Sequence, residues 1–262
     1  MPFTPTRRHV LASVASLSLG TGPGRAQGDA PVVAAASDLQ FAVEEIAAAF
    51  TAGTDMRVRL SFGSTGNFAR QIREGAPFQI FMAADEAFVA GLYRDGFTRD
   101  AGDLYGIGRL AIMAPHGAVL VPDAGLDSLA ELLAAGRIAR FAIANPEHAP
   151  YGMRAREALI ARGLWEELQP FLVLGENVSQ AAAFALSGNA EGGIVAWSLA
   201  LAPQVAGRGH HALIPEDWHQ PLRQRMVLLN GAGPVAEAFY AFLMQPDARA
   251  ILARYGFVLP EA

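Results

Sequence analysis

The sequence of 262 residues contains no cysteine and no lysine. The absence of cysteine excludes disulfides, thiolate nucleophiles, zinc fingers and cysteine-ligated iron–sulfur clusters. All 20 basic residues are arginine, which we attribute to the base composition of the genome and not to function. Charged residues make up only 17% of the chain and hydrophobic residues 52%, so the composition is that of a folded globular protein and excludes a disordered polymer.

The chain also lacks an excess of positive charge and a hydrophobic run long enough to span a bilayer. Its formal net charge of −5 argues against nucleic acid or an anionic membrane surface as a partner. The motifs Gly-x-Ser-x-Gly, His-Glu-x-x-His and Gly-x-x-x-x-Gly-Lys are absent from the sequence. We therefore expect a protein that is not an enzyme, has no nucleic-acid partner and is not embedded in a membrane. We also expect a monomer.

The first 26 residues have the order of a bacterial export signal. Arg7 and Arg8 stand directly before a modest apolar run over 10–19, and a stretch rich in glycine follows. Gly24 and Ala26 place small residues at positions −3 and −1 of a cut after residue 26. The arginine pair predicts a signal of the twin-arginine type, and the missing cysteine leaves no site for a lipid anchor. We therefore expect the mature protein to lie in the periplasm.

Strands and helices are expected to alternate from about residue 30. Apolar or alternating segments predict strands over 32–36, 57–62, 79–83, 141–144, 171–174 and 193–197. Helices are expected to follow these strands, with Ser37 and Asp38 capping the first and later ones beginning near residues 68, 153 and 179. This order predicts an α/β fold with mostly parallel sheets, whose ligands bind where strands lead into helices.

Four of these strand-to-helix loops offer small or hydroxyl-bearing residues at the start of a helix, at 37–38, 63–66, 150–152 and 177–179. The N-terminus of a helix carries free N–H groups and a partial positive charge, and serine and threonine add hydroxyl donors. For any single loop, ordinary helix capping explains the residues. Several such loops that converge would bind an anion without any arginine.

The loops in combination resemble those of the periplasmic molybdate-binding proteins. The resemblance begins with Val33-Ala34-Ala35-Ala36-Ser37-Asp38-Leu39 and Phe62-Gly63-Ser64-Thr65-Gly66-Asn67, and continues through 75–85, 145–152, 175–180 and 254–257. It runs in order from about residue 31 to residue 260. It implies a two-lobed periplasmic-binding fold of type II that closes over a tetrahedral oxyanion. It also implies the substrate receptor of an ABC importer for molybdate and tungstate, with a membrane permease as partner and no cofactor.

The resemblance also implies which residues contact the oxyanion. Ser37 and Thr65 are expected to donate hydroxyl hydrogen bonds, with Ser64 as the neighbouring alternate. Backbone N–H groups of these loops would complete the cage, namely those of Ser37, Thr65, Asp38, Tyr151 and Val178. The expected lobes are 30–110 with 227–262, and 111–226, joined by a two-stranded hinge.

Two positions depart from the pattern of many family members. Ala196 stands where many have a tyrosine that reaches the anion, and Leu199 replaces a common aspartate. Another branch of the family also lacks that tyrosine and carries Pro-Tyr-Gly in the earlier loop, as this chain does at 150–152. We interpret Trp197 as core packing or a wall of the cleft.

Asp38 admits two interpretations, because a carboxylate beside a dianion is repelled. The favoured one is an N-cap whose side chain turns onto its own helix and leaves only its N–H for the ligand. The other is an acceptor for a protonated oxyanion, which would favour phosphate or arsenate over molybdate, tungstate or sulfate.

Three further alternatives were weighed. An exported hydrolase of oxyanion esters would need a nucleophile with a base, a metal set or paired carboxylates, and no such pattern is evident. A ligand-sensing regulator would need a DNA-binding segment where the export signal stands. His210, His211, Asp217 and His219 match no zinc spacing and are expected in a polar surface loop.

Overall fold

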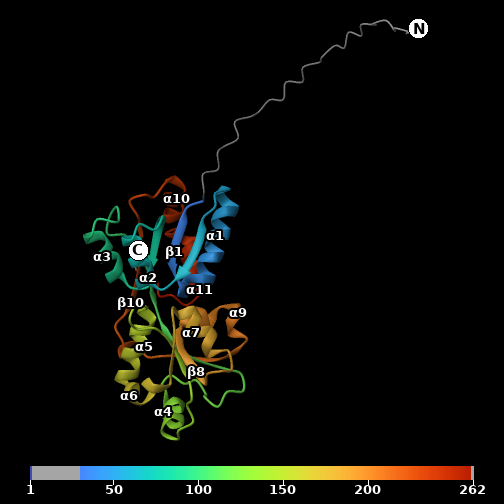
Figure 1. Cartoon of the computed structure of the whole chain (residues 1–262), viewed down its shortest axis with the longest axis vertical. Coiled ribbons are helices and arrows are strands. Elements are labelled where there is room, and N and C mark those ends of the chain that lie inside the picture. The colour runs from blue at the N-terminus through green and yellow to red at the C-terminus, as the bar shows by residue number, and fades with distance from the viewer. Residues whose placement is uncertain (2–29, 261–262) are drawn as a thin grey trace.

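The computed structural model describes residues 30–260 together with Met1. The predicted export signal, apart from Met1, lies outside the described residues. The described chain forms two α/β lobes stacked along the long axis of the molecule (Figure 1), each built on a five-stranded sheet. Both chain ends of the described part lie in the first lobe, since β1 and the helices α10 and α11 all pack there.

The first lobe contains the strands β1 (Val32–Ala36), β2 (Arg59–Gly63), β3 (Phe78–Ala83), β4 (Asp103–Gly108) and β10 (Leu222–Leu228). Its helices are the short 3-10 helix η1 (Ser37–Leu39), α1 (Gln40–Thr54), α2 (Thr65–Arg73), α3 (Glu86–Arg94), α10 (Pro234–Leu243) and α11 (Pro246–Arg254).

The second lobe contains the strands β5 (Leu110–Pro115), β6 (Phe141–Ala144), β7 (Leu172–Gly175), β8 (Gly192–Ala196) and β9 (Gly209–Leu213). Its helices are α4 (Asp127–Ala134), α5 (Pro150–Ala161), α6 (Trp165–Leu168), α7 (Val178–Ala185), α8 (Trp197–Leu201) and α9 (Pro203–Ala206), with 3-10 turns η2 (Gln169–Phe171) and η3 (Glu216–Trp218).

The two sheets share one pattern of strand directions. The first has the order β2-β1-β3-β10-β4, with β2, β1 and β3 parallel and β10 antiparallel to both of its neighbours. The second has the order β7-β6-β8-β5-β9, with β5 antiparallel to both neighbours. In each sheet one strand therefore runs against the other four. The predicted two-lobed α/β fold with mostly parallel sheets is confirmed.

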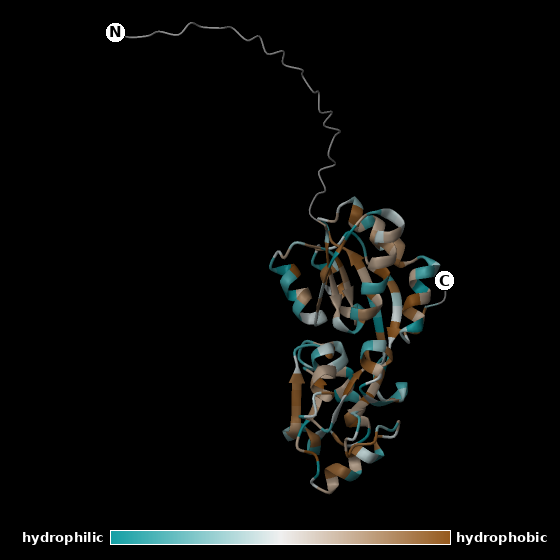
Figure 2. Cartoon of the chain, turned by 90° about the vertical axis from the view of Figure 1, so that its right-hand side faces the viewer, coloured by the Kyte–Doolittle hydropathy of each residue, from teal (hydrophilic) through white to brown (hydrophobic). Residues whose placement is uncertain are grey.

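Alternating side chains of β1 explain how the first sheet is covered on both faces. Val33 and Ala35 pack into a large buried cluster with α1, whereas Ala34 between them packs into a second cluster with α2 and α3. Both faces of the strand are therefore buried, as expected for a parallel strand that is small and apolar throughout. Figure 2 shows the same arrangement, with hydrophobic residues along the strands and hydrophilic ones on outer helical faces.

The chain crosses between the lobes twice. Arg109 alone separates β4 of the first sheet from β5 of the second, and the second crossing lies between β9 and β10. Sheet membership places Leu110 in the second lobe and all of β10, Leu222–Leu228, in the first. The lobe boundaries after residues 110 and 226 remain a prediction, since strand pairing defines sheets and not the hinge about which lobes move.

Several predicted boundaries were wrong by a few residues. The helix expected from Met153 begins at Pro150, because proline at the first helical position needs no N–H partner. Trp197, expected at the end of a strand, is the first residue of α8. His210 and His211, expected in a loop, lie in the edge strand β9, which pairs with β5.

Candidate functional site

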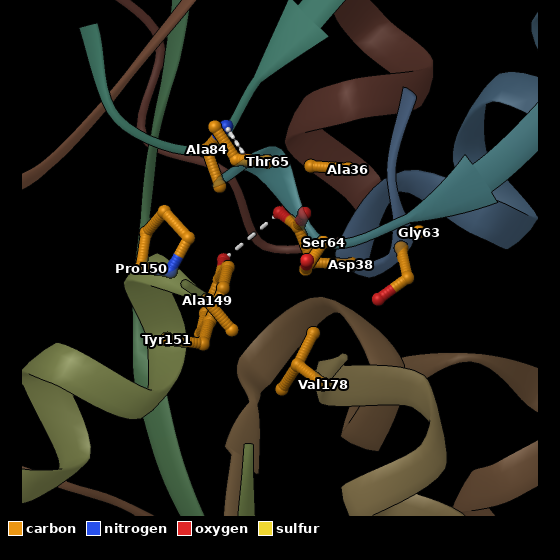
Figure 3. A pocket seen from close by; sticks show the side chains of 11 residues that line it. Ala36, Asp38, Gly63, Ser64, Thr65, Ala84, Ala149, Pro150, Tyr151 and Val178 are labelled. Carbon is orange, nitrogen blue, oxygen red and sulfur yellow. Dashed lines mark hydrogen bonds between the residues drawn. The ribbon is translucent and has the colours of Figure 1, made fainter. Parts of the chain in front are cut away.

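A pocket between the lobes collects the loops that the sequence singled out. It is lined by Ala36, Ser37, Asp38, Gly63, Ser64, Thr65, Ala84, Ala149, Pro150, Tyr151 and Val178. Figure 3 shows residues of the first lobe facing the N-terminal turns of α5 and α7. All six residues expected to contact a ligand therefore line one pocket. Their contact with an anion stays a prediction.

The hydroxyl groups of the first lobe are held by contacts that fix their oxygens. Thr65 is fully buried at the start of α2, and its Oγ1 accepts a hydrogen bond of 3.0 Å from the N–H of Ala84. Ser37 follows β1, and its Oγ accepts a 3.2 Å bond from the N–H of Ser179 in the second lobe. Because each oxygen accepts a bond from a backbone N–H, each hydroxyl proton is available for an anion.

Ser64 has a different role from its neighbour. It is the N-cap of α2, where its Oγ lies 3.4 Å from the N–H of Asn67. The same Oγ lies 2.9 Å from Nδ1 of His148 in the opposite lobe. Ser64 therefore both caps its helix and joins the lobes at the edge of the pocket.

Three helices present unbonded N–H groups to the pocket. Thr65 and Val178 are the first residues of α2 and α7, and Tyr151 is the second residue of α5. An N–H in the first turn of a helix has no partner within that helix. The next residue along each helix bonds elsewhere, with Gly66 donating to His148, Gly152 to Ala149 and Ser179 to Ser37. Over residues 30–260 no protein acceptor is bonded by the N–H of Thr65, Tyr151 or Val178, so they remain free for an anion.

The interpretation of Asp38 as an N-cap was wrong. The N-cap of η1 is Ala36 and that of α1 is Leu39, and no side chain caps either helix. Asp38 is buried between the lobes, where its Oδ2 accepts a 3.0 Å bond from the Tyr151 hydroxyl and a 2.7 Å bond from Nε2 of Gln224. These two buried side-chain donors bond the carboxylate, whereas no N–H of η1 or α1 is capped by it.

Burial governs the ionisation of this group. It raises the pKa of the Asp38 carboxyl from about 3.8 to about 6, although hydrogen bonding from Gln224, Tyr151 and the Asp38 backbone acts in the opposite direction. Burial and the neighbouring Asp38 also raise the pKa of Tyr151 well above its ordinary value. Tyr151 therefore keeps its proton and donates to Asp38.

Other contacts hold the lobes together around the pocket. Gly66 N–H donates a 2.9 Å bond to the carbonyl oxygen of His148, which spans the cleft. Nη2 of Arg154, on α5, lies 2.7 Å from Oδ2 of Asp85, and both side chains are at most 14% exposed. Removing one partner of a pair so withdrawn from solvent would leave the other charge buried and unpaired, so the pair favours the closed arrangement.

Arg154→Met is expected to weaken anion binding by about tenfold without touching the anion, because it removes an interlobe contact worth about 1.4 kcal/mol. The loss should appear as faster release in stopped-flow dissociation. Arg156→Met on the same helix is the matched control, since its guanidinium lies over the Trp165 ring within the second lobe. Equal release rates for the two variants would contradict a role for the Arg154–Asp85 pair in closure.

The sequence missed Gln224, His148 and Ser179 as parts of this site. Gln224 is fully buried in β10, and its neighbours on the same face of the strand, Leu222 and Met226, are apolar. A polar residue on an apolar strand face was the signal that could have identified it. Ser179 also donates its hydroxyl to the backbone carbonyl of Ser37, at 2.8 Å. His148 lies in the segment 145–152 that carries the family resemblance, but the sequence did not indicate its bond to Ser64.

The two departures from the family pattern lie away from the pocket lining. Trp197 packs its ring against His211, 5.2 Å away, so its interpretation as a packing residue is supported. Ala196 and Leu199 are buried in the core of the second lobe. Tyr151 supplies a tyrosine hydroxyl near the pocket, but it is directed to Asp38.

The pocket is suited to binding through neutral donors. Among the residues that the structure describes, no arginine lines it. Within residues 30–260, no group of three or more histidine or acidic side chains is arranged to hold a metal ion. In the same part of the chain, no helix has the length and apolarity needed to cross a membrane.

Comparison with known proteins agrees with this geometry. The family described as bacterial extracellular solute-binding protein matches residues 31–258. The molybdate-binding protein ModA of Rhodobacter capsulatus is 34% identical over 94% of this chain and 95% of its own. ModA of Escherichia coli K12 is 35% identical over 89% of this chain and 90% of its own. The solved structure of the periplasmic molybdate-binding protein of Azotobacter vinelandii superposes with a TM-score of 0.79 at 30% identity, covering 88% of this chain and all of that one.

These relatives are named as binding proteins, which agrees with the prediction that the chain is not an enzyme. The matches cover both lobes and every loop that lines the pocket. The chain therefore belongs to the family of bacterial extracellular solute-binding proteins, in the group that contains the molybdate-binding proteins.

Proposed function

We propose that this protein is a receptor that binds molybdate or tungstate between its lobes and delivers the anion to an ABC permease. The observation that carries the proposal is the pocket itself, where hydroxyl donors of the first lobe face free N–H groups of the second. Relatives at 34–35% identity are named for molybdate binding, which supports the same ligand.

Neutral donors are sufficient for this ligand. A hydrogen bond to a charged group contributes roughly 1.5–3 kcal/mol. The hydroxyls of Ser37 and Thr65, with the N–H groups of Thr65, Tyr151 and Val178 and of Asp38, would supply about six such bonds. Their sum of roughly 9–18 kcal/mol, less the cost of association and closure, corresponds to micromolar to nanomolar affinity.

The proposal also fits the charge of the protein. The net negative charge of the chain disfavours the binding of a large polyanion over its surface. A small dianion in a closed pocket depends instead on the hydrogen-bond donors that touch it. We infer that the chain is exported by its twin-arginine-type signal, acts in the periplasm as a monomer, and presents the closed arrangement of its lobes to the permease.

A thermal-shift panel tests the ligand. Molybdate, tungstate, sulfate, phosphate and arsenate are compared at equal excess on the mature protein. A ligand at 1,000 times its Kd stabilises by about 4.1 kcal/mol, or roughly 8–16 °C for a chain of this size. We expect that rise with molybdate and tungstate. A rise with phosphate or arsenate alone, or no rise with any anion, would contradict the proposal.

A further inference from the structure

The two carboxylate oxygens of Asp38 differ in their surroundings. Oδ2 accepts both protein hydrogen bonds, from Tyr151 at 3.0 Å and from Gln224 at 2.7 Å. Oδ1 is buried and, over residues 30–260, has no hydrogen-bond partner. Asp38 itself lines the pocket, and Figure 3 shows it joined to Tyr151 across the gap between the lobes. An unpartnered buried oxygen is costly unless a further group bonds it.

Over residues 30–260, no cationic side chain bonds this carboxylate or shifts its pKa. The titratable groups that face it are Tyr151 of α5 and, beyond Gln224, Tyr105 of β4, whose hydroxyl lies 2.7 Å from Oε1 of Gln224. From α8, Ser198 bonds the carbonyl oxygen of Asp38 and leaves the carboxylate untouched. From α7, Ser179 bonds Ser37. His148 lies at the edge of the pocket on Ser64.

A dianion in this pocket would lie beside an ionised carboxylate in a region of low dielectric, where like charges repel strongly. One proton removes the conflict. Placed on Oδ1, it converts the unpartnered acceptor into a donor aimed at an anion oxygen, while Oδ2 keeps its bonds from Tyr151 and Gln224. Burial already raises the pKa of this carboxyl to about 6, and the nearby charge of a bound dianion would raise it further, so that the carboxyl is protonated in the complex.

We propose that the receptor takes up one proton from solvent with each oxyanion, and that this proton lies between Oδ1 of Asp38 and an oxygen of the anion. The inference rests on the proposed function, because it assigns a proton to the same site. Anion and proton bind together, so each promotes the binding of the other. Above the pKa of the carboxyl the apparent affinity for a dianion falls as pH rises.

Isothermal titration of molybdate into the protein measures this coupling. Titrations at pH 7 and pH 8, in two buffers that differ in ionisation enthalpy, give both the Kd and the number of protons taken up. We expect uptake close to one proton, and a Kd that rises about tenfold from pH 7 to pH 8. Molybdate itself carries no proton over this range. Uptake near zero with an unchanged Kd would overturn the inference, although molybdate still binds.

Two variants assign the proton. Asp38→Asn keeps an acceptor for Tyr151 and Gln224 and offers an amide N–H in place of the proton, so we expect no uptake and a flat pH profile. His148→Gln removes the nearby imidazole, and we expect the uptake to persist. The reverse pattern would assign the proton to His148 and overturn the inference.

Should Asp38→Asn fail to fold, Tyr151→Phe serves in its place. It removes one hydrogen bond that stabilises the ionised carboxylate, so proton uptake should persist to higher pH. Absence of molybdate binding at either pH would instead refute the proposed function.

Discussion

Replacing Ser37 and Thr65 together with alanine is expected to weaken molybdate binding by about 10²–10⁴-fold. Each hydroxyl is buried and fixed by a backbone N–H that bonds its oxygen, from Ser179 and from Ala84 respectively. Each therefore directs its proton to the pocket, and the loss of two charge-assisted bonds costs about 3–6 kcal/mol. Titration calorimetry on the purified double variant measures the change.

The control for this variant removes one threonine hydroxyl and one serine hydroxyl outside the pocket. Thr51 in α1 donates its hydroxyl to the carbonyl of Ala47, and Ser187, just after α7, donates to that of Phe184; neither residue lines the pocket. Thr51→Ala with Ser187→Ala should leave the Kd unchanged. Thr65→Ala also leaves the buried N–H of Ala84 without its partner, at about 1–3 kcal/mol of stability, so Thr65→Ser is a second control that restores the hydroxyl. If the double variant Ser37→Ala, Thr65→Ala binds as tightly as the native protein, the assigned site is wrong.

Gly66→Ala is expected to prevent the lobes from closing and to weaken binding by at least about 100-fold. A Cβ on Gly66 would lie 2.5 Å from the carbonyl oxygen of His148 and 3.1 Å from its Cα, both backbone atoms of the opposite lobe. A separation of 2.5 Å is far below van der Waals contact, so the lobes would have to move apart. The N–H of Tyr151 and that of Val178 would then be withdrawn from an anion held by the first lobe.

The fold should tolerate this substitution well. Gly66 lies within α2, where alanine is more favourable than glycine by about 0.5–1 kcal/mol. Gly53→Ala is the matched control, because Gly53 lies within α1 and a Cβ there has no neighbour within 4 Å. Small-angle scattering with saturating molybdate should show an open Gly66→Ala variant and a closed Gly53→Ala variant. A closed Gly66→Ala variant with native affinity would contradict the role of this approach in closure.

The local features of the site were predictable from the sequence. Ser37, Thr65 and Val178 each come shortly after an apolar or alternating strand and open a helix, so short-range signals placed them at strand ends. Parallel strands of one sheet bring their carboxyl ends to one edge, which explains why separate loops meet in one pocket. The resemblance to a known family then indicated which of these loops face one another.

The interlobe partners were not predictable in this way. Asp38 is separated from Tyr151 by 113 residues and from Gln224 by 186, and no local pattern pairs such residues. The short-range rule for an aspartate before a helix favoured capping. The carboxylate instead accepts hydrogen bonds from Tyr151 of the other lobe and from Gln224 of β10. The bond from Arg154 to Asp85 has the same origin, since it depends on how the lobes close.

The central claim is that an oxyanion is held between the lobes by the loops at Ser37, Thr65, Tyr151 and Val178. Anomalous diffraction at a tungsten absorption edge, from crystals grown with tungstate, locates the anion directly. We expect one strong peak in the pocket, within hydrogen-bond reach of the hydroxyls of Ser37 and Thr65 and of the N–H groups of Tyr151 and Val178. A well-occupied peak elsewhere, or an unoccupied pocket at saturating tungstate, would contradict it.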